Sequence, residues 1–376
     1  MSATTSKLFT PIKVGTSLLG HRAVLAPLTR YRANSAHVHG DLAVEHYEQR
    51  GSTPGTLLIT EATFIAQRAS GYAHVPGIWT DDQVAAWKRV TDAVHKKGSY
   101  IYIQLWAIGR AADPKVLKEE DPDLPYVSAS DVQLTGKPFP PRPLTVAEIK
   151  EYVQLFATAA SNAVHRAGFD GIELHNANGY LPDQFLQNVT NKRTDEYGGS
   201  IENRSRFTLE ILEAISKEIG QERTAIRLSP WGRFQEMRMD EANLRSTFSY
   251  LVSEITKRFP NFAYLHVVEP RVEGSEDRTV QHGEEIDFLR DIWGSRPFIS
   301  AGGYTREAAI STADNKGDLI AFGRAFIANP DLPFRLEKDI PLTIGDRSSY
   351  YTWESPVGYN DYPFSKEFES GKQASL

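Results

Sequence analysis

The sequence predicts an α/β fold, a single (β/α)8 TIM barrel in which eight parallel strands alternate with helices. Short apolar runs recur along the 376 residues, and amphipathic segments with helix start and stop signals separate them. Alternation of this kind is typical of a parallel sheet with crossover helices. The length would also suit two domains, but eight repeats without an obvious switch point favour one closed barrel over residues 1–376.

Eight candidate strands can be marked in chain order. They are residues 22–26, 56–60, 100–105, 171–174, 224–228, 262–267, 297–300 and 318–322. Each run is short and mainly apolar, which is typical of a buried parallel strand. We therefore expect all eight in the barrel wall.

The helices between these strands carry their own signals. Thr80 with Gln83, and Thr145 with Glu148, fit the capping box, in which side chains and backbone N–H groups of the first turn bond reciprocally. Apolar stripes at helical spacing follow both boxes and recur at residues 207–219 and 244–255. We interpret all four stripes as core packing.

Two long polar segments interrupt the alternation. Residues 111–143, after the third strand, are rich in Pro, Asp and Lys and have no helical period, and residues 269–282 follow the sixth strand. Loops after barrel strands lie at the catalytic mouth, so we expect extended capping loops at the C-terminal face, although plain surface loops are an equal alternative.

Composition excludes several functions. The net charge is −6, which gives no electrostatic signal for a nucleic-acid or anionic membrane partner. The chain has no Cys, so disulfides, thiolate nucleophiles and thiolate metal sites are excluded. We see no signal peptide, membrane span or good peroxisomal signal, and expect a cytoplasmic protein, monomer or homodimer.

The most informative stretch is residues 170–180, DGIELHNANGY, in which a buried strand runs into polar residues. His175 and Asn178 can both donate hydrogen bonds to one oxygen, and Tyr180 can give a proton to a carbanion-like centre. Two donors and an acid at a strand end suit the formation and protonation of an enolate. A surface loop with three polar residues is the alternative.

Other strand ends add polar groups suited to a flat heterocycle, namely Thr29, Gln104 and Arg227. No Lys stands at a strand end, which argues against Schiff-base chemistry, and no His pair is spaced for a metal site. His266 stands alone on the sixth strand, and we interpret it as a core histidine with its hydrogen bonds satisfied.

A phosphate site is predicted after the last two strands. Gly302-Gly303 and Gly323-Arg324 fall where barrels bind phosphate, since glycines let backbone N–H groups approach the oxygens and Arg adds charge-assisted bonds. Either pair alone is weak evidence. The two pairs in consecutive loops are a much stronger sign.

These motifs together resemble the Old Yellow Enzyme family of flavin-dependent ene-reductases, and its fungal members above all. The resemblance runs from about residue 8 to about residue 363 and rests on LAPLTRYR (25–32), LITEA (58–62), QLW (104–106), HNANGYLPDQF (175–185), RTDEYGGSIENR (193–204), AGG (301–303) and FGR (322–324). We expect residues 193–204 to be a structural cap without a direct catalytic role.

The resemblance implies a cofactor, FMN, lying across the barrel mouth. Its ring would contact Pro27, Leu28, Thr29, Ala62, Gln104 and Arg227, and its phosphate Gly302, Gly303, Gly323 and Arg324. The family often has Gly in place of Ala62 and Asn in place of Gly303. Both contacts would be made largely by backbone atoms, so these two differences from the family change the expected FMN contacts little.

The resemblance also implies a reaction, the NADPH- or NADH-dependent reduction of activated C=C bonds in α,β-unsaturated carbonyl and related nitro compounds. His175 and Asn178 would bind the substrate oxygen, Tyr180 would protonate the α-carbon, and hydride would come from flavin N5. Trp106, Tyr350 and Tyr351 would line the substrate space, with ordinary packing as the alternative. A narrow biosynthetic reductase or isomerase, and a flavin protein with no alkene substrate, are the competing hypotheses.

Overall fold

Eight parallel strands form a closed barrel in the computed structural model, which describes residues 5–274 and 276–373. The strands are β3 (Ala23–Leu25), β4 (Leu57–Phe64), β5 (Tyr100–Trp106), β8 (Gly171–Asn176), β9 (Thr224–Leu228), β10 (Tyr264–Val268), β13 (Phe298–Ala301) and β14 (Leu319–Phe322). Each pairs with the next in this order, and β14 pairs with β3 to close the wall. All eight predicted strands lie in the barrel, which confirms the predicted fold class.

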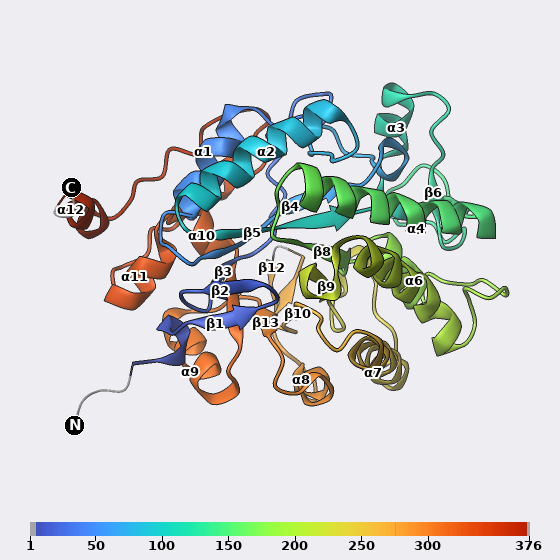
Figure 1. Cartoon of the computed structure of the whole chain (residues 1–376). Helices are drawn as coiled ribbons and strands as arrows, with labels where there is room; N and C mark the ends of the chain where they lie inside the picture. The colour runs from blue at the N-terminus through green and yellow to red at the C-terminus, as the bar shows by residue number, and fades with distance from the viewer. Residues whose placement is uncertain (1–4, 275, 374–376) are drawn as a thin grey trace.

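Helices surround the strands, as Figure 1 shows. They are α1 (Asp41–Arg50), α2 (Asp81–Lys96), α3 (Pro114–Glu120), α4 (Val146–Ser161), α5 (Leu181–Leu186), α6 (Ile201–Ile219), α7 (Glu241–Arg258), α8 (Asp287–Trp293), α9 (Arg306–Lys316), α10 (Arg324–Ala328), α11 (Leu332–Lys338) and α12 (Lys366–Gln373). Both predicted capping boxes are formed, at the starts of α2 and α4. Each such cap stabilises its helix by about 1 kcal/mol.

The core has an outer and an inner part. The four predicted stripes of α2, α4, α6 and α7 are buried against the outside of the barrel. Inside, a second cluster fills the lower barrel, and the hairpin of β1 (Ile12–Val14) and β2 (Ser17–Leu19) adds Val14 and Leu19 to it. The turn of this hairpin requires Gly15, because its φ is 54° and a Cβ there would lie 1.9 Å from the Glu222 carbonyl oxygen.

Strand β4 is longer than predicted, since it continues to Phe64. Its pairing with β5 shifts between Ile59 and Ala62, so the strand carries a bulge at the barrel mouth. Ala62 lines the pocket described below, whereas the Glu61 carboxylate accepts a hydrogen bond from the Arg30 backbone N–H at 3.2 Å.

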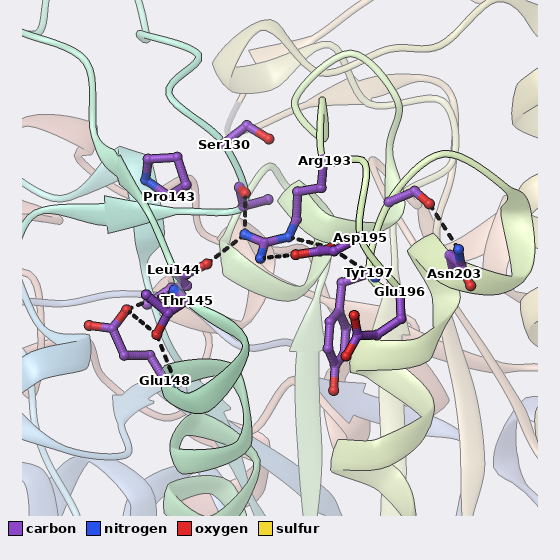
Figure 2. Close-up of polar contacts among 12 residues, drawn as sticks. Ser130, Pro143, Leu144, Thr145, Glu148, Arg193, Asp195, Glu196, Tyr197 and Asn203 are labelled. Atoms are coloured by element: carbon purple, nitrogen blue, oxygen red, sulfur yellow. Dashed lines mark hydrogen bonds and ion pairs between the residues drawn. The ribbon is translucent and has the colours of Figure 1, made fainter.

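Residues 111–143, expected to be an extended loop because they show no helical period, contain a short helix. Helix α3 occupies seven of them, with Asp113 accepting from the Lys115 N–H as the N-cap and Pro114 in the first turn. Figure 2 shows how Arg193 fixes the far part of this segment. Its guanidinium donates to the carbonyls of Ala129 (3.0 Å) and Leu144 (2.6 Å) and forms an ion pair with Asp195. These contacts give residues 193–204 the structural role predicted for them.

Candidate active site

One large pocket of about 610 Å³ opens at the carboxyl ends of the barrel strands. Every predicted site residue lines it: Pro27, Leu28, Thr29, Ala62, Gln104, Trp106, His175, Asn178, Tyr180, Arg227, Gly302, Gly303, Gly323, Arg324, Tyr350 and Tyr351. They come from seven strand ends and from the C-terminal segment. The fold therefore brings together residues more than three hundred positions apart, from Pro27 to Tyr351. The pocket volume is typical of small-molecule sites.

The wall formed after β8 holds the polar residues of the HNANGY motif. Asn178 has a left-handed φ of 57°, and its N–H donates to the Ser229 hydroxyl at 2.7 Å. The next N–H, of Gly179, donates to the buried Asp183 carboxylate at 2.9 Å. These two bonds fix the turn so that His175, Asn178 and Tyr180 all face one cavity.

Burial sets the protonation of this wall. It lowers the pKa of His175 well below the usual range, and the positive charge of Arg227 acts in the same direction. Burial raises the pKa of Tyr180 well above its ordinary value. At neutral pH the wall thus presents a neutral imidazole and a protonated phenol, which are two hydrogen-bond donors of very different acidity.

The floor of the pocket carries Gln104 and Arg227. Burial lowers the pKa of the Arg227 guanidinium, while Glu173 opposes this shift. The Nε atom of Arg227 is buried and has no hydrogen-bond partner among the described residues. A buried cation with an unused donor suits a ligand that is rich in electrons at that point, as a reduced flavin is.

The opposite end of the pocket is built for close backbone approach. Gly302 and Gly303 have φ values of 137° and 59°, and a Cβ on Gly302 would lie 2.8 Å from Val272. Arg324, predicted for phosphate, lines this end but forms an ion pair with Asp277 in the structure. Arg324 therefore lies at the end of the pocket where the phosphate site was predicted, and the Asp277 carboxylate is its partner.

Aromatic residues close the upper side. Trp106 is buried and stacks on Phe64 with ring centroids 4.9 Å apart. Tyr350 is also buried, whereas Tyr351 is 47% exposed at the pocket rim. Of the three predicted substrate-lining aromatics, Tyr351 is thus exposed at the rim and the other two are buried.

Several pocket residues had no signal in the sequence. Tyr31, Tyr72, Phe234, Val272, Asp277 and Arg347 line the cavity from loops. Of these, Val272 and Asp277 belong to the second predicted capping segment, in a hairpin of β11 (Val272–Glu273) and β12 (Glu276–Asp277). None of the described lining residues comes from positions 112–143, which pack behind Trp106 through Leu117 and Tyr126.

Two features are absent from residues 5–274 and 276–373. No group of three or more His, Asp or Glu side chains is placed to hold a metal ion. No helix in these ranges has both the length and the hydropathy to cross a bilayer.

A barrel whose mouth combines a polar floor, a glycine-lined end and a donor wall defines a cofactor-dependent oxidoreductase of the flavin class. Comparison with known proteins agrees, since residues 7–343 match the model of the NADH:flavin oxidoreductase / NADH oxidase family. The chain belongs to this family, and within it to the Old Yellow Enzyme group.

Fungal relatives span nearly the whole chain. The NADP-dependent oxidoreductase lnbE of Aspergillus flavus is 48% identical, covering 96% of this chain and 97% of its own. Chanoclavine-I aldehyde reductase fgaOx3 of Penicillium roqueforti is 47% identical, covering 98% and 100%. A protein of Epichloe festucae var. lolii named probable inactive reductase easA is also 47% identical, covering 99% of both chains.

Solved structures agree with the fold. Old Yellow Enzyme from Pichia sp. AKU4542 is 38% identical to this chain and superposes with a TM-score of 0.89, covering 96% of this chain and 94% of its own.

Proposed function

We propose that the protein is an FMN-dependent reductase of activated alkenes that uses NADPH or NADH as the reductant. The observation that carries the proposal is the convergence of His175, Asn178 and Tyr180 on the same cavity as Gln104 and Arg227. When bound, FMN supplies the hydride chemistry, taking hydride from the nicotinamide and delivering it to the alkene β-carbon. The names of two relatives, an NADP-dependent oxidoreductase and an aldehyde reductase, support this reading.

The residues present fit FMN. The ring would lie over Pro27, Leu28, Thr29 and Ala62, with Gln104 and Arg227 at its polar edge. Gly302, Gly303, Gly323 and Arg324 would hold the phosphate, and Arg324 would exchange Asp277 for the more highly charged phosphate oxygens.

His175 and Asn178 would hold the carbonyl or nitro oxygen of the substrate. A neutral imidazole donates a hydrogen bond without giving up its proton, so His175 polarises the double bond and leaves protonation to another group. Both donors face the position where negative charge develops as the enolate forms. This is the differential stabilisation that accelerates the chemical step.

Tyr180 would supply the proton to the α-carbon. Its raised pKa keeps the hydroxyl protonated throughout the neutral range, so the acid is always in its active form. A non-catalytic flavin protein would have no need for this acid beside two oxygen-binding donors. The intact set therefore favours an active enzyme over the state named for the Epichloe relative.

The loops around the mouth would choose the substrate. We assign the hairpin of β11 and β12 to this role because its Gly274 lines the pocket beside Phe234, and residues 111–143 to support of the Trp106 side. A narrow biosynthetic substrate, such as an unsaturated aldehyde, is the second candidate because one relative is named for an aldehyde.

Product analysis tests the proposal. Purified protein with NADPH and without oxygen should convert 2-cyclohexen-1-one, cinnamaldehyde and β-nitrostyrene to their saturated products. Conversion of the aldehyde alone would select the narrow biosynthetic candidate. NADPH oxidation in air without any alkene product would contradict the reductase assignment.

A further inference from the structure

A buried polar layer at the pocket floor includes two residues, Glu173 and His266, to which the proposed function assigns no role. In the strand registers Gln104 pairs with Glu173, while Arg227 pairs with both His175 and His266. Gln104, His175 and Arg227 line the pocket, whereas Glu173 and His266 do not and are fully buried.

The Glu173 carboxylate is held on both sides. The Gln104 amide Nε2 donates to one oxygen at 2.7 Å, and the His266 ring Nδ1 lies 2.8 Å from the other. A carboxylate only accepts hydrogen bonds, so Nδ1 must carry the hydrogen. Burial lowers the pKa of His266 and would raise that of Glu173, but His266, Arg227 and Gln104 together lower the pKa of Glu173. The layer thus contains an anionic carboxylate with a hydrogen-bond donor on each side.

This arrangement determines what Gln104 offers to a ligand. A flipped amide would place its carbonyl oxygen against the carboxylate, and two acceptors repel. Glu173 therefore fixes Gln104 with its nitrogen inward and leaves the carbonyl Oε1 as the acceptor on the other side. A ring N–H at the pocket floor would find its acceptor there.

Glu173 also balances the charge of Arg227 without bonding to it. The carboxylate favours the charged guanidinium electrostatically, while the Arg227 Nε stays without a partner. Its positive charge is thus partly offset, and its donors remain available. Removal of the carboxylate would leave the positive charge of Arg227 unopposed at the pocket floor.

We propose that Glu173, oriented by His266, is a positioning residue of the FMN site that fixes the acceptor of Gln104 and sets the cofactor's affinity and reduction potential. The inference rests on the proposed function, because it requires FMN in this pocket. It concerns two residues that touch neither cofactor nor substrate.

Glu173→Gln is the direct test, read as the FMN dissociation constant and the reduction potential of the holoenzyme. Loss of the fixed amide should weaken binding of oxidised FMN about tenfold. Loss of the negative charge should favour the electron-rich reduced flavin, so the potential should rise by about 30 mV, equivalent to a tenfold change for a two-electron couple.

A matched control separates this effect from general loss of a buried acid. Asp331 is fully buried and ion-paired with Arg335 at 2.7 Å, and it does not line the pocket. Asp331→Asn should reduce stability yet leave the potential and the FMN affinity unchanged.

A second pair of variants tests the His266 contact if Glu173→Gln does not fold. His266→Asn retains a donor near the Nδ1 position, and His266→Leu removes it. The His266→Leu variant should have a raised reduction potential, as expected for Glu173→Gln. The His266→Asn variant should have a reduction potential close to that of the native protein. Equal potentials in the native protein and all folded variants would overturn the inference, whereas a native protein that binds no FMN would overturn the proposed function itself.

Discussion

The ring of Tyr180 meets the ring of Trp106 edge-on, with centroids 4.7 Å apart and planes at 84°. His175 packs on Tyr180 in a similar way at 4.8 Å. Two aromatic neighbours thus fix the direction of the Tyr180 ring, while Tyr180 itself lines the pocket. A substitution that removes the Tyr180 hydroxyl can therefore leave the position of the ring unchanged.

Tyr180→Phe should keep the aromatic packing and remove only the acid. Alkene reduction should slow by about 10²–10⁴-fold, the usual contribution of a general acid. Reduction of the flavin by NADPH should stay within about threefold of the native rate, since it needs no proton from Tyr180. Stopped-flow measurement of each half-reaction separates the two, and equal loss in both would refute the assignment.

Removal of both oxygen donors should abolish ligand binding at the wall. Phenols mimic the enolate, and His175→Ala with Asn178→Ala removes two bonds to their oxygen, so affinity should fall by at least about 100-fold. The long-wavelength charge-transfer band of the phenol complex reports binding. FMN content must be checked in the same sample, because persistence of the band at full occupancy would rule out the oxygen-binding role.

Asp183 should make stability depend on pH. Burial raises the pKa of this carboxyl to about 7, from an ordinary value of 3.8. Between these values the unfolded chain is ionised while the folded chain keeps the proton, so the free energy of unfolding falls as pH rises and the loss is complete above about pH 7.

Asp183→Asn removes this titration. Relative to the native protein it should gain about 2 kcal/mol in the free energy of unfolding between pH 5 and pH 8. Urea denaturation at the two pH values measures the difference. Parallel pH profiles for the two proteins would show that Asp183 titrates normally.

Arg32 should control the substrate side of the pocket through Tyr350. Its buried guanidinium donates to the carbonyls of Ser349 (2.9 Å), Tyr350 (2.7 Å), Ser355 (3.0 Å) and Val357 (2.8 Å). Lysine keeps the charge but cannot serve so many acceptors with its three donors.

Arg32→Lys should therefore loosen residues 349–357. We expect a loss of about 2 kcal/mol in stability and a rise of several-fold in KM, with a smaller change in kcat. Hydrogen exchange of residues 349–357 reports the loosening directly. Arg142→Lys, at an exposed ion pair with Glu148, is the control and should change neither exchange nor KM.

Local patterns account for how much of the fold was predictable. Apolar runs and capping boxes each depend on a few neighbouring residues, so all eight strands and four long helices were located. The start of α3 was also signalled, by Asp113 and Pro114, but the helix is too short for an apolar stripe. The bulge in β4 was not predictable, because it arises from pairing with β5.

The residues of the site also divide into those that local patterns predict and those that they do not. Residues directly after strands, such as His175 and Arg227, were predictable because strand ends converge at one face of a barrel. Loop residues such as Tyr72 and Phe234 were not, since their positions depend on contacts with distant segments. His266 is a core histidine, as interpreted, but its hydrogen bonds are only half satisfied, because Nε2 is buried with no partner among the described residues. Its Nδ1 pairs with Glu173, 93 positions away, which no local pattern reveals.

An anaerobic titration of the purified protein tests the central claim most directly. Our account predicts visible flavin absorbance that bleaches on addition of NADPH and returns on addition of 2-cyclohexen-1-one. A protein that binds no FMN, or whose flavin bleaches with NADPH and stays bleached with every activated alkene supplied, would contradict the proposed function.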